Sequence, residues 1–326
     1  MRTIVPGVRT LVLITALALS LQGKSQSITT GNGKIELGLG FGPLFFLGDL
    51  GGNAGTGKRF IKDINLPTTN IIKGLYVNLY PTEWLGFRFA VNHGKLEGYD
   101  SLIRDKNGAE TYRYNRNLNF QSPVWEVYGA IEFYPTVFME RYDGLQGKLR
   151  PYGVIGIGAF KFNPQGMYYG SDGTGRWVDL KPLSTEGQGM AEYPDRKPYK
   201  LTSIEIPIGV GAKYYIKENF YVGLEIMHRK SFTDYVDDVS TTYIDNNLFG
   251  QYLSSEQAAM ANQLYFREGY QPNGAVSRIP TNGEQRGNAK QNDSFFSSII
   301  RCGWRLNDSN SPNGRASRQM RCPAFY

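Results

Sequence analysis

Ten charged side chains recur inside segments that are otherwise apolar or glycine-rich, and their types allow either acid–base chemistry or ion pairing. They are Glu36, Arg88, Glu126, Glu132, Glu205, Lys213, Glu225, Arg229, Arg301 and Arg305. A pair of carboxylates can serve as general acid and general base. Five carboxylates that share a face with five cations are explained by structural pairing, which is the interpretation we adopt. No catalytic residue, cofactor or metal is therefore predicted among them.

The two histidines of the chain, His93 and His228, allow a second chemistry. Both lie in stretches, described below, that we predict to be strands of a membrane barrel. In those strands the two histidines would face outward, near the extracellular ends. A histidine that works with a serine at such a rim could serve an enzyme that modifies outer-leaflet lipid. No local serine or carboxylate pattern accompanies either histidine, and residues at a membrane interface explain both. A lipid-modifying enzyme stays as an alternative.

One long polar segment carries four aspartates and a predicted helix. The aspartates are Asp234, Asp237, Asp238 and Asp245. Their spacing lacks the glycine and the terminal glutamate of an EF-hand loop, so we interpret them as solvated carboxylates that pair with Arg229 and Lys230. Further along, the segment Ser254–Phe266 has the pattern of a short capped helix.

Strands must position these side chains, because apolar residues alternate with Gly, polar or charged residues in eight stretches. The stretches are Lys34–Leu47, Ile71–Tyr80, Trp84–Leu96, Val124–Tyr134, Leu149–Phe162, Ser203–Ile216, Phe220–Lys230 and Ser294–Leu306. In the third stretch, for example, Phe87 and Phe89 flank Arg88. The charged residues thus share the face opposite to the apolar one. The glycine-rich fifth stretch does not indicate which of its faces points inward and which points outward.

The connections between these stretches alternate between short and long. The short ones are Pro81–Glu83, Pro135–Lys148 and Lys217–Asn219, and the long ones are Gly48–Asn70, Glu97–Pro123, Asn163–Thr202 and Ser231–Asp293. Such alternation is typical of barrels with short periplasmic turns and long extracellular loops. We predict an all-β fold, an eight-stranded antiparallel up-and-down transmembrane β-barrel with long extracellular loops. A soluble lipocalin-like barrel is the alternative, but its outer face would be polar.

The first 25 residues have the three parts of a secretory signal peptide. A basic start is followed by the apolar stretch Thr10–Leu21, which is too short to span a membrane, and by small residues before the predicted cut. The predicted division is a signal peptide over 1–25, an outer-membrane barrel over 26–306 and a periplasmic C-terminal tail over 307–326. The predicted location is the cell outer membrane.

Composition excludes several classes of function. The 326 residues include 22 Tyr, 18 Phe and 39 Gly, a bias that suits strands. Without residues 1–25, 33 Lys and Arg face 29 Asp and Glu, and the resulting net charge of +4 is too small for a nucleic-acid partner. Two cysteines and two histidines are too few for a disulfide framework or a metal cluster. An oxidising periplasm would still permit a bridge between Cys302 and Cys322.

Six motifs spread over nearly the whole chain carry a resemblance to a known family. They are GPLFFLGDLGG at 42–52, PLSTEGQG at 182–189, YPDRKPY at 193–199, FTDYVDDVSTTY at 232–243, RGNAKQNDSFF at 286–296 and RCPAF at 321–325. Together they resemble the Bacteroidota outer-membrane β-barrel family of uncharacterised domain that includes the type IX secretion component PorG. The resemblance implies an outer-membrane barrel and, for the secretion component, association with periplasmic ring proteins. The last strand departs from the family's Asp-Trp-Tyr opening with Asp293, Ser294 and Phe295.

The polar, basic tail 307–326 is predicted to contact a partner or, alternatively, to be disordered. Its candidate contact residues are Arg315, Arg318, Arg321 and Cys322. We predict a structural or interaction component, an accessory of type IX secretion, with outer-membrane lipid and periplasmic secretion-ring proteins as partners. An outer-leaflet lipid-modifying enzyme and a small-solute channel are the alternatives.

Overall fold

Eight long strands close into an antiparallel β-barrel. The computed structural model describes residues 34–51, 66–103, 111–138, 148–170, 173–217, 219–269 and 277–306. Around the wall the strands follow the order β3-β2-β1-β10-β9-β8-β5-β4, and pairing of β3 with β4 closes the sheet. Every pairing is antiparallel. The predicted fold class is confirmed.

The wall strands match the eight predicted stretches closely. They are β1 (Lys34–Leu47), β2 (Asn70–Tyr80), β3 (Leu85–Tyr99), β4 (Asn119–Phe133), β5 (Leu149–Phe162), β8 (Thr202–Lys217), β9 (Phe220–Ser231) and β10 (Ser294–Arg305). The other elements are β6 (Gln165–Tyr169), β7 (Gly175–Asp179), α2 (Thr111–Arg116), α4 (Phe249–Tyr252), α5 (Ser255–Tyr265) and the 3-10 turns η2 (Leu66–Thr68), η3 (Asp100–Leu102), η4 (Pro135–Phe138), η5 (Lys181–Leu183) and η6 (Asn246–Leu248).

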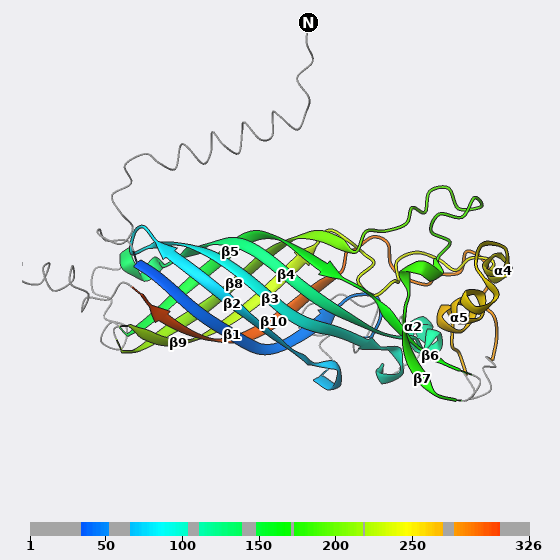
Figure 1. Cartoon of the computed structure of the whole chain (residues 1–326), viewed down its shortest axis with the longest axis horizontal. Coiled ribbons are helices and arrows are strands. Elements are labelled where there is room, and N and C mark those ends of the chain that lie inside the picture. The colour runs from blue at the N-terminus through cyan, green and yellow to red at the C-terminus, as the bar shows by residue number, and fades with distance from the viewer. Residues whose placement is uncertain are drawn as a thin grey trace, which may run out of the picture.

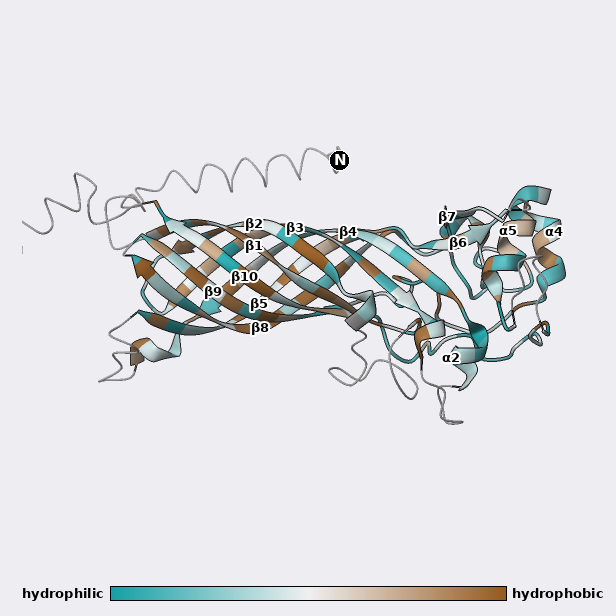
Figure 2. Ribbon diagram, turned by 90° about the horizontal axis from the view of Figure 1, so that it is seen from below, coloured by the Kyte–Doolittle hydropathy of each residue, from teal (hydrophilic) through white to brown (hydrophobic). Residues whose placement is uncertain are grey.

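Alternation along the strands places apolar side chains on the outside of the barrel. Each wall strand contributes at least one exposed apolar residue, namely Leu39, Leu75, Phe89, Val127, Ile157, Val210, Leu224 and Ile300. Figure 2 shows hydrophobic residues in brown at intervals along the wall strands, between hydrophilic ones in teal. Exposed Ile155 and Ile157 against buried Tyr152 and Val154 give the facing of β5 that the sequence leaves open. Burying so many apolar groups requires an apolar surrounding such as lipid.

The two ends of the barrel differ, as Figure 1 shows. At one end, the short-turn end, lie the β2–β3 turn and both described chain ends, Lys34 and Leu306. At the other, the long-loop end, the described parts of residues 48–69, 100–118, 163–201 and 232–293 form a cap that includes the β6–β7 hairpin and the short helices. Within the described residues, no helix has the length and apolar character needed to cross a membrane.

The interior of the barrel toward the short-turn end is filled by tyrosine rings that lie over inward-facing glycines. Gly38 on β1 pairs directly with Gly303 on β10. A Cβ atom on Gly38 would lie 2.2 Å from Cζ of Tyr76, and one on Gly303 would lie 2.4 Å from the ring of Tyr221. The two hydroxyls of these tyrosines are hydrogen-bonded at 2.7 Å. The glycines thus create the space that the two rings occupy.

A cluster of apolar side chains closes the barrel at the long-loop end. We call it the mouth cluster; strand residues Leu44, Ile72, Leu96, Phe120, Val124, Phe160, Phe162, Phe295 and Ile299 meet cap residues Leu50, Leu118, Tyr199, Val236 and Val239. A second cluster, the cap core, lies within the cap and includes Leu180, Met190, Phe249 and Leu264. Helix α5 packs into this core and begins with a capping box between Ser254 and Gln257, as the sequence predicts. The cap is therefore a packed unit seated on the barrel.

Substituting Gly38→Ala should destabilise the barrel. The added methyl group would overlap the ring of Tyr76 and lie 2.7 Å from the backbone oxygen of Cys302, and backbone does not yield easily. Overpacking of this kind costs about 1–3 kcal/mol. We expect a lower urea midpoint for the variant refolded in detergent.

The matched control is Gly153→Ala on β5, where an added Cβ meets no atom within 4 Å. Equal midpoints for the two variants would show that the glycine does not make room for the ring.

Candidate functional site

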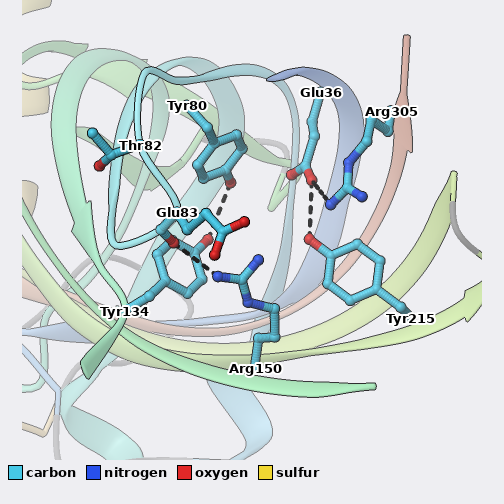
Figure 3. Close-up of a pocket in the computed structure, with 8 residues that line it drawn as sticks. All are labelled: Glu36, Tyr80, Thr82, Glu83, Tyr134, Arg150, Tyr215 and Arg305. Atoms are coloured by element: carbon cyan, nitrogen blue, oxygen red, sulfur yellow. Dashed lines mark hydrogen bonds and ion pairs between the residues drawn. The ribbon is translucent and has the colours of Figure 1, made fainter. Parts of the chain in front are cut away.

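The lumen carries its charges in three groups along its length. The first group lies at the short-turn mouth, which Figure 3 draws. Lys213 donates to Glu36 at 3.0 Å, and Arg305 and Tyr215 donate to the other oxygen of Glu36 at 3.2 and 3.0 Å. The pocket that Glu36, Tyr215 and Arg305 share with Arg150 has a volume of about 10 Å³. That volume holds about one water molecule.

The second group occupies the middle of the lumen, where Arg88 links two glutamates and Arg301 binds one of them. Arg88 donates to Glu132 through Nε at 2.7 Å and to Glu225 through Nη1 at 2.6 Å. Arg301 pairs with the second oxygen of Glu225. Lys213 reaches Glu132 at 3.3 Å and so joins this group to the first. All five side chains are almost completely buried, and opposite charges meet at each contact.

The third group lies closer to the mouth cluster and is less completely paired. Arg229 donates to Glu126 at 2.6 Å and to the hydroxyl of Ser297 at 2.6 Å. Asn92 donates to the second oxygen of Glu126 at 2.6 Å. The carboxyl group of Glu205 is buried beside that of Glu126, and no cation among the described residues donates to it. Of the ten predicted lumen residues, Glu205 is the one that is not placed in an ion pair.

A lumen built in this way is suited to holding the barrel together. An eight-stranded barrel has space for side chains only, and here tyrosines and ion pairs occupy that space. Buried ion pairs contribute little net stability over an apolar core, but removal of one partner is costly. The acid–base interpretation, which the sequence analysis set aside, would need substrate space beside these carboxylates, and the pocket at the short-turn mouth has room for about one water molecule.

The cap contains a second buried network, which the sequence did not reveal. Arg286 donates to Glu186 at 2.8 Å and to the backbone oxygen of Asp238 at 2.6 Å. Glu186 also accepts the backbone N–H groups of Ser240 and Thr241 at 2.9 and 3.0 Å. Glu186 and Arg286 are completely or almost completely buried. The third and fourth long loops are therefore joined by a charged pair that is sequestered from water.

Arg116 connects the remaining loops to this network. It forms a two-point contact with Asp100 at 2.7 and 2.9 Å, and it donates to the backbone oxygens of Asp49 and Arg286 at 2.7 and 2.6 Å. The backbone N–H of Leu50 donates to Asp237 at 2.8 Å. Segments from all four long loops thus meet around two buried arginines.

Burial changes the protonation behaviour of the cap network. Burial opposes the charge of Arg116, but the carboxylate of Asp100 raises the pKa of Arg116, so the guanidinium stays protonated. Burial raises the pKa of Asp238 to about 6, although Arg286 and hydrogen bonds from Thr185 and Tyr199 act in the opposite direction. Tyr199 donates to Asp238 at 2.6 Å. Among the described cap carboxyl groups whose pKa is shifted, that of Asp238 has the pKa nearest to neutral pH.

The interpretation of the loop aspartates as solvated carboxylates is wrong for three of the four, whereas Asp245 is exposed as that interpretation expects. Asp237 and Asp238 are completely buried and Asp234 is 7% exposed. Asp238 pairs within the cap, whereas Arg229 points into the lumen and binds Glu126. The partners of Asp237 and Asp238 are distant in the sequence, so the local pattern does not indicate them: Leu50, Thr185 and Tyr199 lie on other loops, and Arg286 lies at the far end of the same loop. No group of three or more metal-ligating side chains occurs in the part of the chain that the structure describes.

The motifs that carry the family resemblance contain residues of the cap network. Asp49 belongs to GDLGG, Glu186 to STEGQG, Asp238 to VDDVS and Arg286 to RGNAKQ. Each motif places a charged residue among small or polar neighbours. Because their contacts join residues as far apart as 239 positions, spacing along the chain does not predict them.

The two histidines do not form one site. His93 lies on β3 and His228 on β9, which are four strands apart in either direction around the wall, so they stand on opposite sides of the barrel. His93 stacks on Trp125 with ring centroids 4.4 Å apart. Two groups so placed do not act on one bond.

Several predicted features lie outside the described residues. These are the signal peptide 1–25, the tail 307–326 and its candidate contacts Arg315, Arg318, Arg321 and Cys322. Cys302 is half-buried and lies on the outward-facing side of β10. The predicted bridge between the two cysteines thus stays a prediction.

No protein-family model and no curated protein sequence matches the chain. Solved outer-membrane proteins with a similar fold include the following three. Ail of Yersinia pestis is 8% identical over 84% of this chain and 97% of its own, with a TM-score of 0.33. A major outer membrane protein from Thermus thermophilus is 9% identical over 85% and 100%, with a TM-score of 0.38. OprG from Pseudomonas aeruginosa is 9% identical over 84% and 96%, with a TM-score of 0.35.

Substituting Arg88→Leu should destabilise the barrel by about 3 kcal/mol, because Glu132 and Glu225 each lose a buried partner. The measurement is equilibrium unfolding in urea. Arg176→Leu is the control, since its pair with Glu256 is exposed and contributes at most about 1 kcal/mol. Similar losses in both variants would contradict a pairing role for the lumen charges.

The cap should become more stable as the pH falls from 8 to 5. The carboxyl of Asp238 binds its proton more tightly in the folded cap than in an unfolded chain, because its pKa is raised to about 6 from 3.8. Stability is therefore gained as the pH falls through about 6, and the full gain, reached below the unfolded pKa, is roughly 3 kcal/mol. Hydrogen exchange of cap amides, corrected for intrinsic rates, measures this gain.

The variant Asp238→Asn should remove most of the pH dependence. Asn also suits the left-handed backbone at this position, where φ is +63°. An unchanged pH profile in the variant would assign the effect to another group.

Proposed function

We propose that the protein spans the outer membrane as a sealed barrel and acts as a structural or interaction component. The observation that carries this proposal is the closed interior, in which ion pairs and tyrosines fill the lumen and the mouth cluster joins it to the cap. The apolar outer band supports placement in a membrane. In that placement the short-turn end faces the periplasm and the cap faces outward, as in barrels with short periplasmic turns.

The finer part of the proposal is a role as an accessory of type IX secretion. Motifs that carry the resemblance to the PorG-containing family supply residues of the buried cap network, among them Asp49, Glu186 and Arg286. A cap of defined shape presents a constant surface to a partner, since buried contacts join the described parts of all four long loops. Periplasmic ring proteins would bind at the other end, where the tail with Arg315, Arg318, Arg321 and Cys322 begins.

The two alternatives find less support. A small-solute channel needs a continuous path through the lumen, and the charged groups there contact one another directly. A lipid-modifying enzyme built on His93 and His228 would need both groups at one substrate, and they lie on opposite sides of the wall.

Affinity purification of the tagged full-length protein from its own outer membrane in mild detergent tests the secretion role. We expect periplasmic ring or secretion proteins to co-purify, because a sealed barrel exerts its function through contacts. A variant that lacks residues 307–326 should lose them and should still migrate as a folded barrel on unboiled gels.

A barrel that purifies alone would contradict the secretion role and leave the fold unaffected. Identical migration with and without boiling would instead contradict the membrane barrel itself.

A further inference from the structure

Four side chains on four adjacent strands form a row across the outer wall. Lys73 on β2 pairs with His93 on β3, His93 pairs with Trp125 on β4, and Trp125 pairs with Lys161 on β5. Directly opposed residues in antiparallel strands have Cβ atoms about 5 Å apart, so the side chains are in contact range from one strand to the next. Three strand spacings give the row a length of about 14 Å. We call it the basic–aromatic row.

This row lies at the edge of the apolar outer band. The next outward-facing row toward the short-turn end consists of Leu75, Val91, Val127 and Ala159. Leu75, Val91 and Val127 are between 45% and 57% exposed. Basic and aromatic residues that follow directly on an apolar surface are typical of the headgroup level of a membrane. The basic–aromatic row therefore has lipid tails on one side and the cap on the other.

The two central residues form a fixed aromatic surface. The imidazole of His93 stacks on the indole of Trp125 at 4.4 Å with an interplanar angle of 30°. Nδ1 of His93 lies 3.1 Å from the backbone oxygen of Val124, which holds the ring against the strand. Trp125 stays 56% exposed. An amphipathic ring pair of this kind suits the interface between lipid tails and polar headgroups.

The two lysines at the ends of the row leave positive charge uncompensated. Both are exposed, and neither forms an ion pair with a residue that the structure describes. Two acidic residues toward the long-loop end have other partners. Glu97 pairs with Lys95, and Asp179 accepts hydrogen bonds from Asn163 and Gln165 at 2.9 and 2.8 Å. A ligand for this surface must be anionic.

We propose that the basic–aromatic row binds the phosphate-bearing headgroup of an anionic membrane lipid. Lys73 and Lys161 are the cationic contacts, and the His93–Trp125 pair is the surface between them. The apolar row beside them supplies a place for the acyl chains, which free phosphate would not use. This inference rests on the proposed placement of the barrel in a membrane.

The chain offers a matched control on another part of the wall. Lys230 on β9 is also exposed, faces outward and lies near the long-loop end. Its directly opposed neighbours are Ile206 and Ser294, so it belongs to no basic row. Loss of Lys230 removes one surface charge without changing the proposed site.

The test compares lipid retention by three proteins inserted in phosphatidylcholine nanodiscs that contain a minor fraction of phosphatidylglycerol. Wild type, the Lys73→Gln/Lys161→Gln double variant and Lys230→Gln are released into mild detergent, and the lipids that stay bound are counted by native mass spectrometry. We expect wild type and Lys230→Gln to keep phosphatidylglycerol. The double variant should lose affinity roughly 30-fold, as expected for two lysines near a lipid surface.

Each other outcome overturns a defined part of the inference. Equal retention by all three proteins would show that the row does not bind the lipid. Displacement of the lipid from wild type by excess inorganic phosphate would show that the site recognises free phosphate. A wild-type protein that fails to insert, with identical migration on boiled and unboiled gels, would overturn the membrane placement and with it this site.

Discussion

A charge enclosed in an eight-stranded barrel has no bulk water to solvate it, and the rest of the interior follows from that constraint. Each buried arginine or lysine of the lumen lies against a glutamate, and tyrosine hydroxyls occupy further positions around those glutamates. The rings need space, which glycines directly opposed to them on the neighbouring strands supply. The buried charges thus account for the tyrosines, whose hydroxyls bind the glutamates, and the tyrosine rings account for the glycines beside them.

The same constraint explains the cap. Long loops carry many backbone N–H and C=O groups, and burying them over the mouth requires partners. Glu186 accepts from two backbone N–H groups and Arg116 donates to two backbone oxygens. Buried charged side chains thus replace the regular hydrogen bonding that strands have. A loop assembly held in this way has one preferred shape, which is what recognition by contact demands.

The sequence predicts the wall far better than the cap, for a physical reason. Period-two alternation is a local signal, and β1 and β5 begin and end at the predicted residues. β4 begins five residues before the predicted stretch, because β3 and β4 stay paired beyond the barrel wall. In β5, glycines on both parities conceal the facing. The pair Glu186–Arg286 joins loops 100 residues apart, and no local pattern of charge distinguishes such a pair from solvated side chains.

The junction between Asp49 and Asn288 has a consequence for how the molecule forms. The backbone N–H of Asn288 donates to Asp49 at 2.6 Å, although 239 residues separate them. Contacts between such distant parts of a chain form late, because the entropy of closing the intervening chain must be overcome first. The contact between the first and the last long loop therefore forms late, and the cap can be completed only after β10 has paired with β1. A finished cap is in this sense a marker of completed assembly, and any surface that depends on it is absent from folding intermediates.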